Sequence, residues 1–173
     1  MRLVEYRLAP KYRSVLDRVD AVLDQAAALI AQRERHGLGK VEVAVTITNG
    51  MPDLICAAHE RLVGASDWEP WARSTGDGFT TLNSSGSLVI INAQLLYGKA
   101  IEIDQTVLHE LKHAAQYNRP GAWRAGRKVI AYDYGIGWLS DGELREADRR
   151  RIRDEREAEA AERFHRQLAK AVA

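Results

Sequence analysis

The chain has 173 residues, of which 46% are hydrophobic and 28% charged, so it can bury one hydrophobic core. Twenty-five basic and 24 acidic residues leave a formal net charge of +1, which argues against nucleic acid or a membrane as the main partner. The single cysteine, Cys56, excludes an internal disulfide and a cysteine-based zinc site and fits a reducing compartment. Since we find no signal peptide and no apolar run of roughly 20 residues, we expect one cytoplasmic domain over residues 1–173.

The first half of the chain predicts helices separated by one strand. Apolar residues recur at helical spacing from Lys11 to His36. A strand is expected over Lys40 to Thr48, where β-branched residues alternate with others before an Asn-Gly turn. A short helix follows from Pro52 to Gly64, with proline near its start and glycine after its end. The segment from Ala65 to Gly78 is expected to be a long loop with two tryptophan anchors.

The second half predicts a hairpin followed by two helices. Its strands run from Phe79 to Leu82 and from Leu88 to Ile91, separated by a Ser/Gly turn. A helix follows almost at once and is broken at Arg119-Pro120-Gly121. The next segment, which contains "AYDYGIGW", matches no clear pattern. A charged helix is expected from about Ser140 towards the C-terminus.

The first of these two helices contains the sequence HELKH, an HExxH motif formed by His109, Glu110 and His113. Two histidines one helical turn apart present their ring nitrogens to a single cation. At about 100° per residue the helix also carries one continuous apolar stripe, and both histidines lie outside it. This stripe consists of Ile103, Val107, Leu108, Leu111, Ala114 and Ala115. The helix can therefore bury one side and present the histidines to a cleft.

The motif predicts a zinc site that hydrolyses peptide bonds. Neutral imidazoles bind Zn²⁺ and leave it a Lewis acid, and an open position lets its water reach a pKa of about 7. Glu110 is the expected general base, which accepts the proton of that water and passes it to the leaving amine. A polypeptide is thus the expected substrate.

A catalytic zinc site of this kind needs a third protein ligand. Candidates downstream are Asp133, Glu155, Glu157, Glu159, Glu162 and His165, and candidates upstream are His36 and His59. On the wheel of the C-terminal helix, Glu155 is centred on the face expected to pack inward. Glu159 lies one turn further on and could ligate instead, or accept a hydrogen bond from a zinc-bound histidine. For Glu157 and Glu162 we expect exposed positions with ion pairs along the helix.

The segments "VLHELKHAAQY" and, about forty residues later, "EREAEAAERF" resemble the gluzincin metallopeptidases, especially minimal single-domain forms such as the ImmA/IrrE family. The resemblance covers roughly Leu88 to Phe164. It implies His109, His113 and Glu155 as zinc ligands, Glu110 as general base, and Glu159 as a supporting carboxylate. The sequence departs from the family pattern at Glu159, where Asp or Asn is usual, and at Ala161, where an aromatic residue is common.

This resemblance also implies a fold. We expect an α+β, zincin-like domain with a small, mostly antiparallel sheet, a long N-terminal helix, the HExxH helix and a C-terminal helix. In such folds an edge strand before the metal helix binds extended peptide by strand addition. The stretch "SLVIIN", from Ser87 to Asn92, occupies that place in the sequence. An ordinary interior strand is an equal alternative for this stretch.

Two other functions stay open at this point. "AYDYGIG" resembles a fragment of the aspzincin element, which would make Asp133 the third ligand and Tyr134 a hydrogen-bond donor to the transition state. Alternatively, the chain is an inactive, zinc-stabilised module that binds protein or nucleic acid through the basic run Arg145 to Arg156. Acidic residues interrupt that run and cancel much of its charge, and an intact Glu110 favours catalysis.

Overall fold

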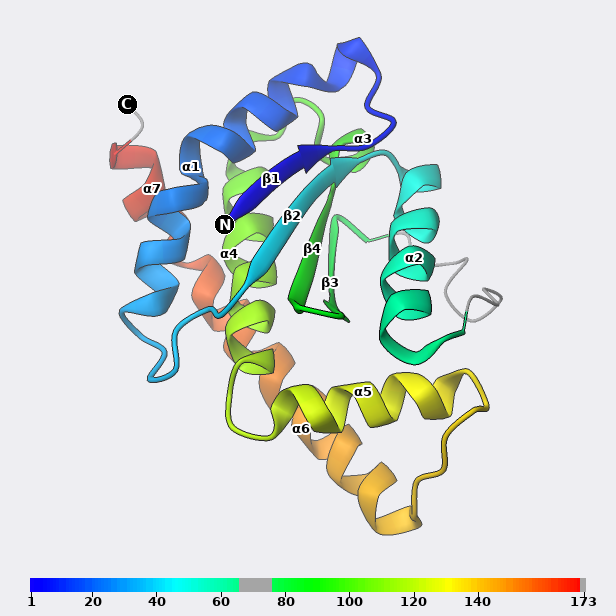
Figure 1. Ribbon diagram of the computed structural model, residues 1–173. Coiled ribbons are helices and arrows are strands. Elements are labelled where there is room, and N and C mark those ends of the chain that lie inside the picture. Colours follow the sequence, from blue (N-terminus) through cyan, green and yellow to red (C-terminus); the bar gives the residue numbers. More distant parts are fainter. Residues whose placement is uncertain (66–75, 172–173) are drawn as a thin grey trace.

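The computed structural model describes residues 1–65 and 76–171 and has an α+β architecture (Figure 1). Its strands are β1 (Arg2–Glu5), β2 (Val41–Thr46), β3 (Gly78–Asn83) and β4 (Gly86–Asn92). Its α-helices are α1 (Arg13–Ala31), α2 (Met51–Val63), α3 (Ala93–Leu96), α4 (Ala100–Tyr117), α5 (Ala122–Asp133), α6 (Asp141–Glu162) and α7 (His165–Ala171). Short 3-10 helices cover Pro10–Tyr12 and Thr48–Gly50. The two tryptophans expected to anchor a loop, Trp68 and Trp71, lie outside the described residues.

The strands form one mixed sheet in the order β1-β2-β4-β3. β1 pairs with β2 in parallel, β2 pairs with β4 in parallel, and the β3–β4 hairpin is antiparallel. The expectation of a mostly antiparallel sheet is therefore wrong. Helix α1 provides the crossover that parallel pairing of β1 and β2 requires, and β1 itself was not predicted.

Of the two alternatives for "SLVIIN", an edge strand or an interior strand, the structure shows the interior strand. These residues belong to β4, which lies between β2 and β3 and is buried from Ser87 to Asn92. A continuous apolar run is typical of an interior strand with both faces covered, which is what β4 is. The edge strand on this side is β3, so its outer edge is not paired with another described strand.

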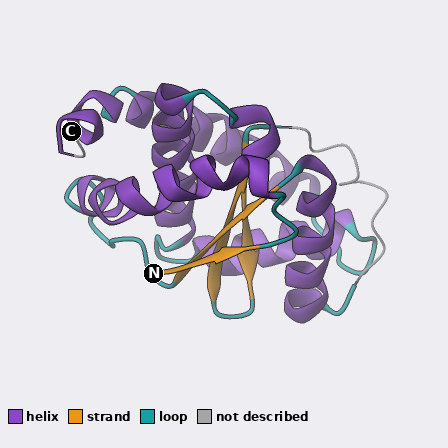
Figure 2. Cartoon of the chain, turned by 90° about the horizontal axis from the view of Figure 1, so that it is seen from above, coloured by secondary structure: helices purple, strands orange, loops and turns teal. Residues whose placement is uncertain are grey.

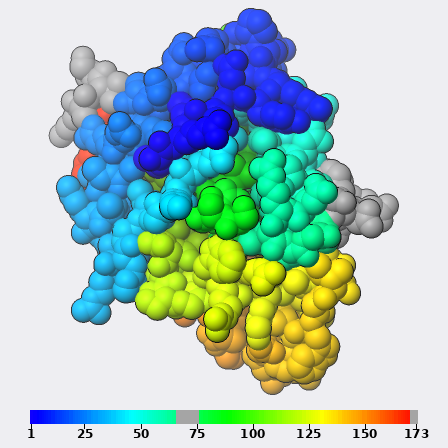
Figure 3. Space-filling view, in the orientation of Figure 1, coloured from blue at the N-terminus to red at the C-terminus, as the bar shows by residue number. Residues whose placement is uncertain are grey.

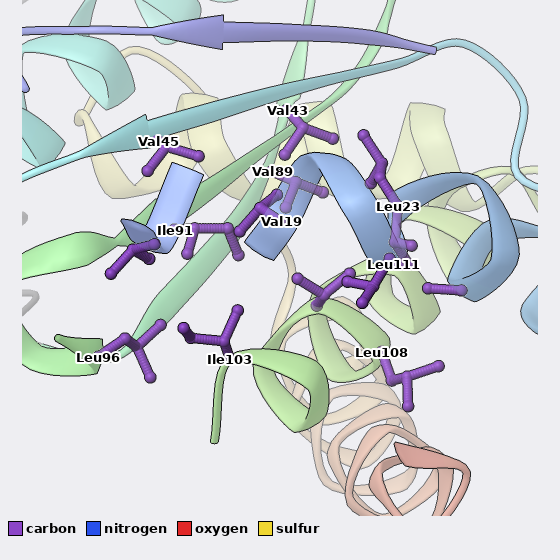
Figure 4. Close-up of a cluster of buried hydrophobic side chains, with 14 of the residues drawn as sticks. Val19, Leu23, Val43, Val45, Val89, Ile91, Leu96, Ile103, Leu108 and Leu111 are labelled. Carbon is purple, nitrogen blue, oxygen red and sulfur yellow. The ribbon is translucent and has the colours of Figure 1, made fainter. Parts of the chain in front are cut away.

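Helices cover both faces of the sheet, and the strands lie in the middle of the molecule (Figure 2). One face packs against α1 and α4, and its core includes Val43 and Val89 from the sheet, Val19 and Leu23 from α1, and Leu111 from α4 (Figure 4). The other face packs against α2 through Ala44, Leu88, Ile90, Met51, Ile55 and Ala58. The alternation of side chains along β2 and β4 thus supplies two separate cores.

Helices α5 and α6 form the lower part of the molecule as seen in Figures 1 and 3. Helix α6 begins where expected, because Ser140 and Glu143 form a reciprocal capping box at its N-terminus. Its surface is mostly polar, and its buried residues are Ala158 and Ala161. Helix α5 begins after Gly121, which has a φ of 76° and makes no side-chain cap. No helix in the described part of the chain is both long and apolar enough to cross a lipid bilayer.

Candidate metal centre

Helix α4 is oriented by the apolar stripe that its sequence predicts. All six stripe residues are buried, and they pack into the core beneath the sheet. The side chains of His109 and His113 lie on the opposite flank and are 17% and 20% exposed. The packing of α4 therefore leaves both histidines accessible from outside the core, as predicted.

His109, His113 and Glu155 converge on one point between α4 and α6. The two Nε2 atoms are 3.1 Å apart, His109 Nε2 is 3.3 Å from Glu155 Oε1, and His113 Nε2 is 3.4 Å from Glu155 Oε2. Ligand atoms held about 2.1 Å from a tetrahedral zinc ion lie about 3.4 Å from one another. The three side chains therefore fit a single small cation. The side chain of Glu155 is 50% exposed to solvent.

The outer nitrogens of both histidines have acceptors. His109 Nδ1 is 2.8 Å from Glu162 Oε1, and His113 Nδ1 is 2.7 Å from Gln116 Oε1. With Nδ1 donating in each ring, both Nε2 lone pairs point at each other, an arrangement that a cation between them would stabilise.

The resemblance to gluzincins implies Glu159 as the supporting carboxylate, but the structure places another residue beside His109. The carboxylate beside His109 is Glu162, whereas Glu159 is exposed on α6. Glu162 was expected to be a solvent-facing residue in an ion pair along the helix. The position of Glu162 could have been predicted from the sequence, because it follows Glu155 by two helical turns and therefore lies on the same face of the helix.

Glu110 is buried beside the ligands and contacts strand β3. The Thr80 hydroxyl lies 2.7 Å from Glu110 Oε2, and a Cβ added at Gly78 would lie 2.7 Å from Glu110 Oε1. Gly78 is thus required by the close approach of the strand to this side chain. Burial raises the pKa of Glu110, and His113, the Thr80 hydroxyl and His109 oppose that rise. Neither β3 residue was identified from the sequence, since their role depends on how the sheet packs on α4.

The centre opens into a cleft of about 820 Å³ between β3, α4, α5 and α6. Its lining includes Glu110, the three clustered side chains and apolar residues such as Val129 and Leu139. Asp133 also lines this cleft, at the end of α5, but it is not part of the ligand cluster found among the described residues. Tyr134 is hydrogen-bonded through its hydroxyl to His59 Nδ1 at 3.0 Å.

Two arginines of the basic run of α6 form ion pairs with carboxylates of the same helix. Arg149 pairs with Glu146 at 2.8 Å, and Arg153 lies 3.6 Å from Asp154. Arg150 and Arg151 line the cleft beside acidic residues of the same helix. Basic and acidic residues thus lie next to one another along this part of the helix.

Comparison with known proteins adds no relative. No protein-family model, no curated protein and no solved structure matches this chain. The function must therefore be argued from the centre itself.

Proposed function

We propose that the protein is a zinc-dependent metallopeptidase of the gluzincin type, with a polypeptide as substrate. The observation that carries the proposal is the convergence of His109 Nε2, His113 Nε2 and the Glu155 carboxylate at separations of 3.1 to 3.4 Å. Two imidazoles and one carboxylate are the ligand set of a catalytic zinc site with one position left for water. Bound there, zinc would supply a Lewis acid and lower the pKa of water to about 7.

Glu110 performs the proton transfers in this proposal. Its carboxylate takes one proton from the attacking water while the oxygen bonds to the carbonyl carbon of the peptide. The same proton then passes to the amide nitrogen as the C–N bond breaks, which yields an amine and a carboxylic acid. The acid then loses the second proton of the water to solvent and becomes a carboxylate. The raised pKa of buried Glu110 suits a group that must both accept and release a proton. A purely structural zinc site has no use for such a residue.

Strand β3 gives the substrate a place to bind. It is an edge strand, it contacts Glu110 through Thr80, and its residues from Gly78 to Thr81 line the cleft. An extended peptide paired with the outer edge of β3 would pass beside the ligand cluster. An exposed strand edge therefore favours an extended peptide as substrate over a compact small molecule. The strand proposed to bind it is β3, in place of β4.

The test combines metal content with hydrolysis. Zinc per chain is measured in the wild type, His109→Ala, Glu155→Ala and the matched control Glu159→Ala after zinc is supplied, together with Glu110→Gln. We expect about one zinc in the wild type, Glu110→Gln and Glu159→Ala, and a large loss in the other two. Cleavage of an unfolded protein is then followed by mass spectrometry. Among the three proteins that bind zinc, the wild type and Glu159→Ala should cleave it, and Glu110→Gln should not.

A wild type that binds no zinc overturns the proposal. Zinc binding that survives in Glu155→Ala moves the third ligand to another carboxylate, with Asp133 next in order because it lines the same cleft. Cleavage that persists in Glu110→Gln contradicts the role of the base.

A further inference from the structure

The buried carboxamide of Gln116 makes two short hydrogen bonds, to α4 and to α6, and a longer one of 3.5 Å to Glu157. Gln116 lies on α4 one turn after His113 and is 4% exposed. Its Oε1 is 2.7 Å from His113 Nδ1, and its Nε2 is 2.7 Å from the backbone carbonyl oxygen of Asp154 on α6. Both ends of the amide are thus used inside the protein.

These contacts fix the direction of each hydrogen bond. The Asp154 carbonyl oxygen can only accept, so the amide nitrogen of Gln116 must face it. The amide oxygen is then left for His113, which must donate from Nδ1. In the neutral ring, Nε2 then carries the lone pair and faces Glu155, which is the form that binds a cation.

The second contact reaches the backbone immediately before Glu155. Asp154 and Glu155 are adjacent on α6, so the hydrogen bond from Gln116 holds the helix at the residue that precedes the carboxylate. A shift of α6 along its axis would break this bond and move Glu155 away from the two histidines.

We propose that Gln116 is a positioning residue that couples two metal ligands from different helices, fixing the tautomer of His113 and the position of Glu155 together. This inference rests on the proposed function, because it concerns the same metal centre. Partners that orient metal ligands typically change metal affinity about 10- to 100-fold when they are removed. Gln116 serves two ligands, so its loss should have an effect in that range.

Two substitutions separate the two contacts. Gln116→Met has a similar length and makes neither hydrogen bond. Gln116→Glu keeps an acceptor for His113 but loses the donor, and its carboxylate faces the Asp154 carbonyl oxygen and the carboxylate of Glu157, which lies 3.5 Å from the present amide nitrogen. Gln105→Met on the same helix is the matched control.

The affinity for Zn²⁺ is measured by competition with a chromogenic chelator, for each variant with and without Glu155→Ala. We expect Gln116→Met to bind zinc about 10- to 100-fold more weakly than wild type and Gln105→Met to bind it normally. Gln116→Glu should weaken binding only where Glu155 is present, because it acts through α6. Gln116→Met should weaken binding in both backgrounds, because it also acts through His113.

Imidazole ¹⁵N NMR of the metal-free protein provides a readout that a purely structural role would not change. We expect His113 to carry its proton on Nδ1 in the wild type and in Gln116→Glu, and to lose that single tautomer in Gln116→Met. Wild-type zinc affinity in both Gln116 variants would overturn the coupling while leaving the proposed function intact. Failure of the wild type itself to bind zinc would instead reject the proposed function.

Discussion

The hydroxyl of Thr80 lies 2.7 Å from Glu110 Oε2 and 3.0 Å from the Glu110 backbone oxygen, so edge strand β3 is tied directly to the HExxH helix. Thr80→Val preserves the shape of the side chain and removes the hydroxyl. Since a hydrogen bond to a charged group contributes about 1.5 to 3 kcal/mol, we expect peptide hydrolysis to slow about 10- to 100-fold. Zinc content should stay at the wild-type level.

Thr80→Ser is the matched control, because it restores the hydroxyl without the methyl group. Initial rates of cleavage should return most of the way to wild type in this variant. Equal rates for Thr80→Val and wild type would show that Glu110 needs no support from β3.

Glu162 accepts a hydrogen bond from His109 at 2.8 Å, so it should strengthen metal binding at the opposite ring nitrogen. Glu162→Gln replaces a charged acceptor with a neutral one, and we expect zinc affinity to fall about tenfold. Glu159→Gln, on the exposed side of the same helix, should leave affinity unchanged. Chelator competition would contradict the structure if Glu159→Gln had the larger effect.

Arg18 and Asp104 join α1 to α4 through two hydrogen bonds of 2.8 Å and 2.5 Å. The Asp104 side chain is only 2% exposed, so removal of its partner leaves a buried, unpaired carboxylate. We expect Arg18→Leu to reduce the free energy of unfolding by about 3 kcal/mol, measured with urea. The double variant Arg18→Leu with Asp104→Leu should recover much of this loss, and failure to do so would mean that the pair itself is not the cause.

His59 is fully buried and hydrogen-bonded to Thr81 and Tyr134, and burial lowers its pKa to about 4. The unfolded chain binds a proton at this residue near pH 6.5, whereas the folded protein does not until about pH 4. Stability should therefore be intact above pH 6.5 and fall as the pH drops, by about 3 kcal/mol at pH 4 from this residue.

His59→Gln removes this titration and tests its contribution. The free energy of unfolding is measured from pH 7.5 to pH 4.5 by urea denaturation in both proteins, each without metal. The wild type should lose stability more steeply than the variant as the pH falls. Parallel curves would show that His59 does not remain neutral in the folded state.

Local patterns predicted the elements whose structure is set by their own residues. The period of α4 gave both its buried stripe and the exposed flank with His109 and His113. The alternation and turn of the β3–β4 hairpin were equally clear, and Ser140 marked the start of α6. The parallel pairing of β1 and β2 was missed, because four residues at the N-terminus carry little pattern and their partner lies forty residues away.

In the candidate centre, too, some residues could be predicted from local sequence patterns and others could not. Helical spacing led to His109, Glu110, His113 and Glu155, all of which the structure brings together at the cleft. Thr80 could not be found this way, because its partner lies on another element. Gln116 lies one helical turn after His113, but its contact with Asp154 on α6 depends on tertiary packing. Helix α5 was not predicted, since Gly121 provides no capping side chain and Gly126 lies in the interior of the helix.

The polar surface of α6 has a consequence for how the molecule responds to its metal. Its buried residues are two alanines, so this helix docks largely through the hydrogen bonds and ion pairs of His109, Lys112 and Gln116 on α4 and of Arg119 just after α4. A cation held by α4 and α6 together would add a tie between the two helices that the apolar core does not supply. Amide hydrogens of α6 should then exchange with solvent more slowly when zinc is bound, while those of the central sheet change little. Zinc binding at the centre would thus make α6 more rigid and leave the central sheet as it is.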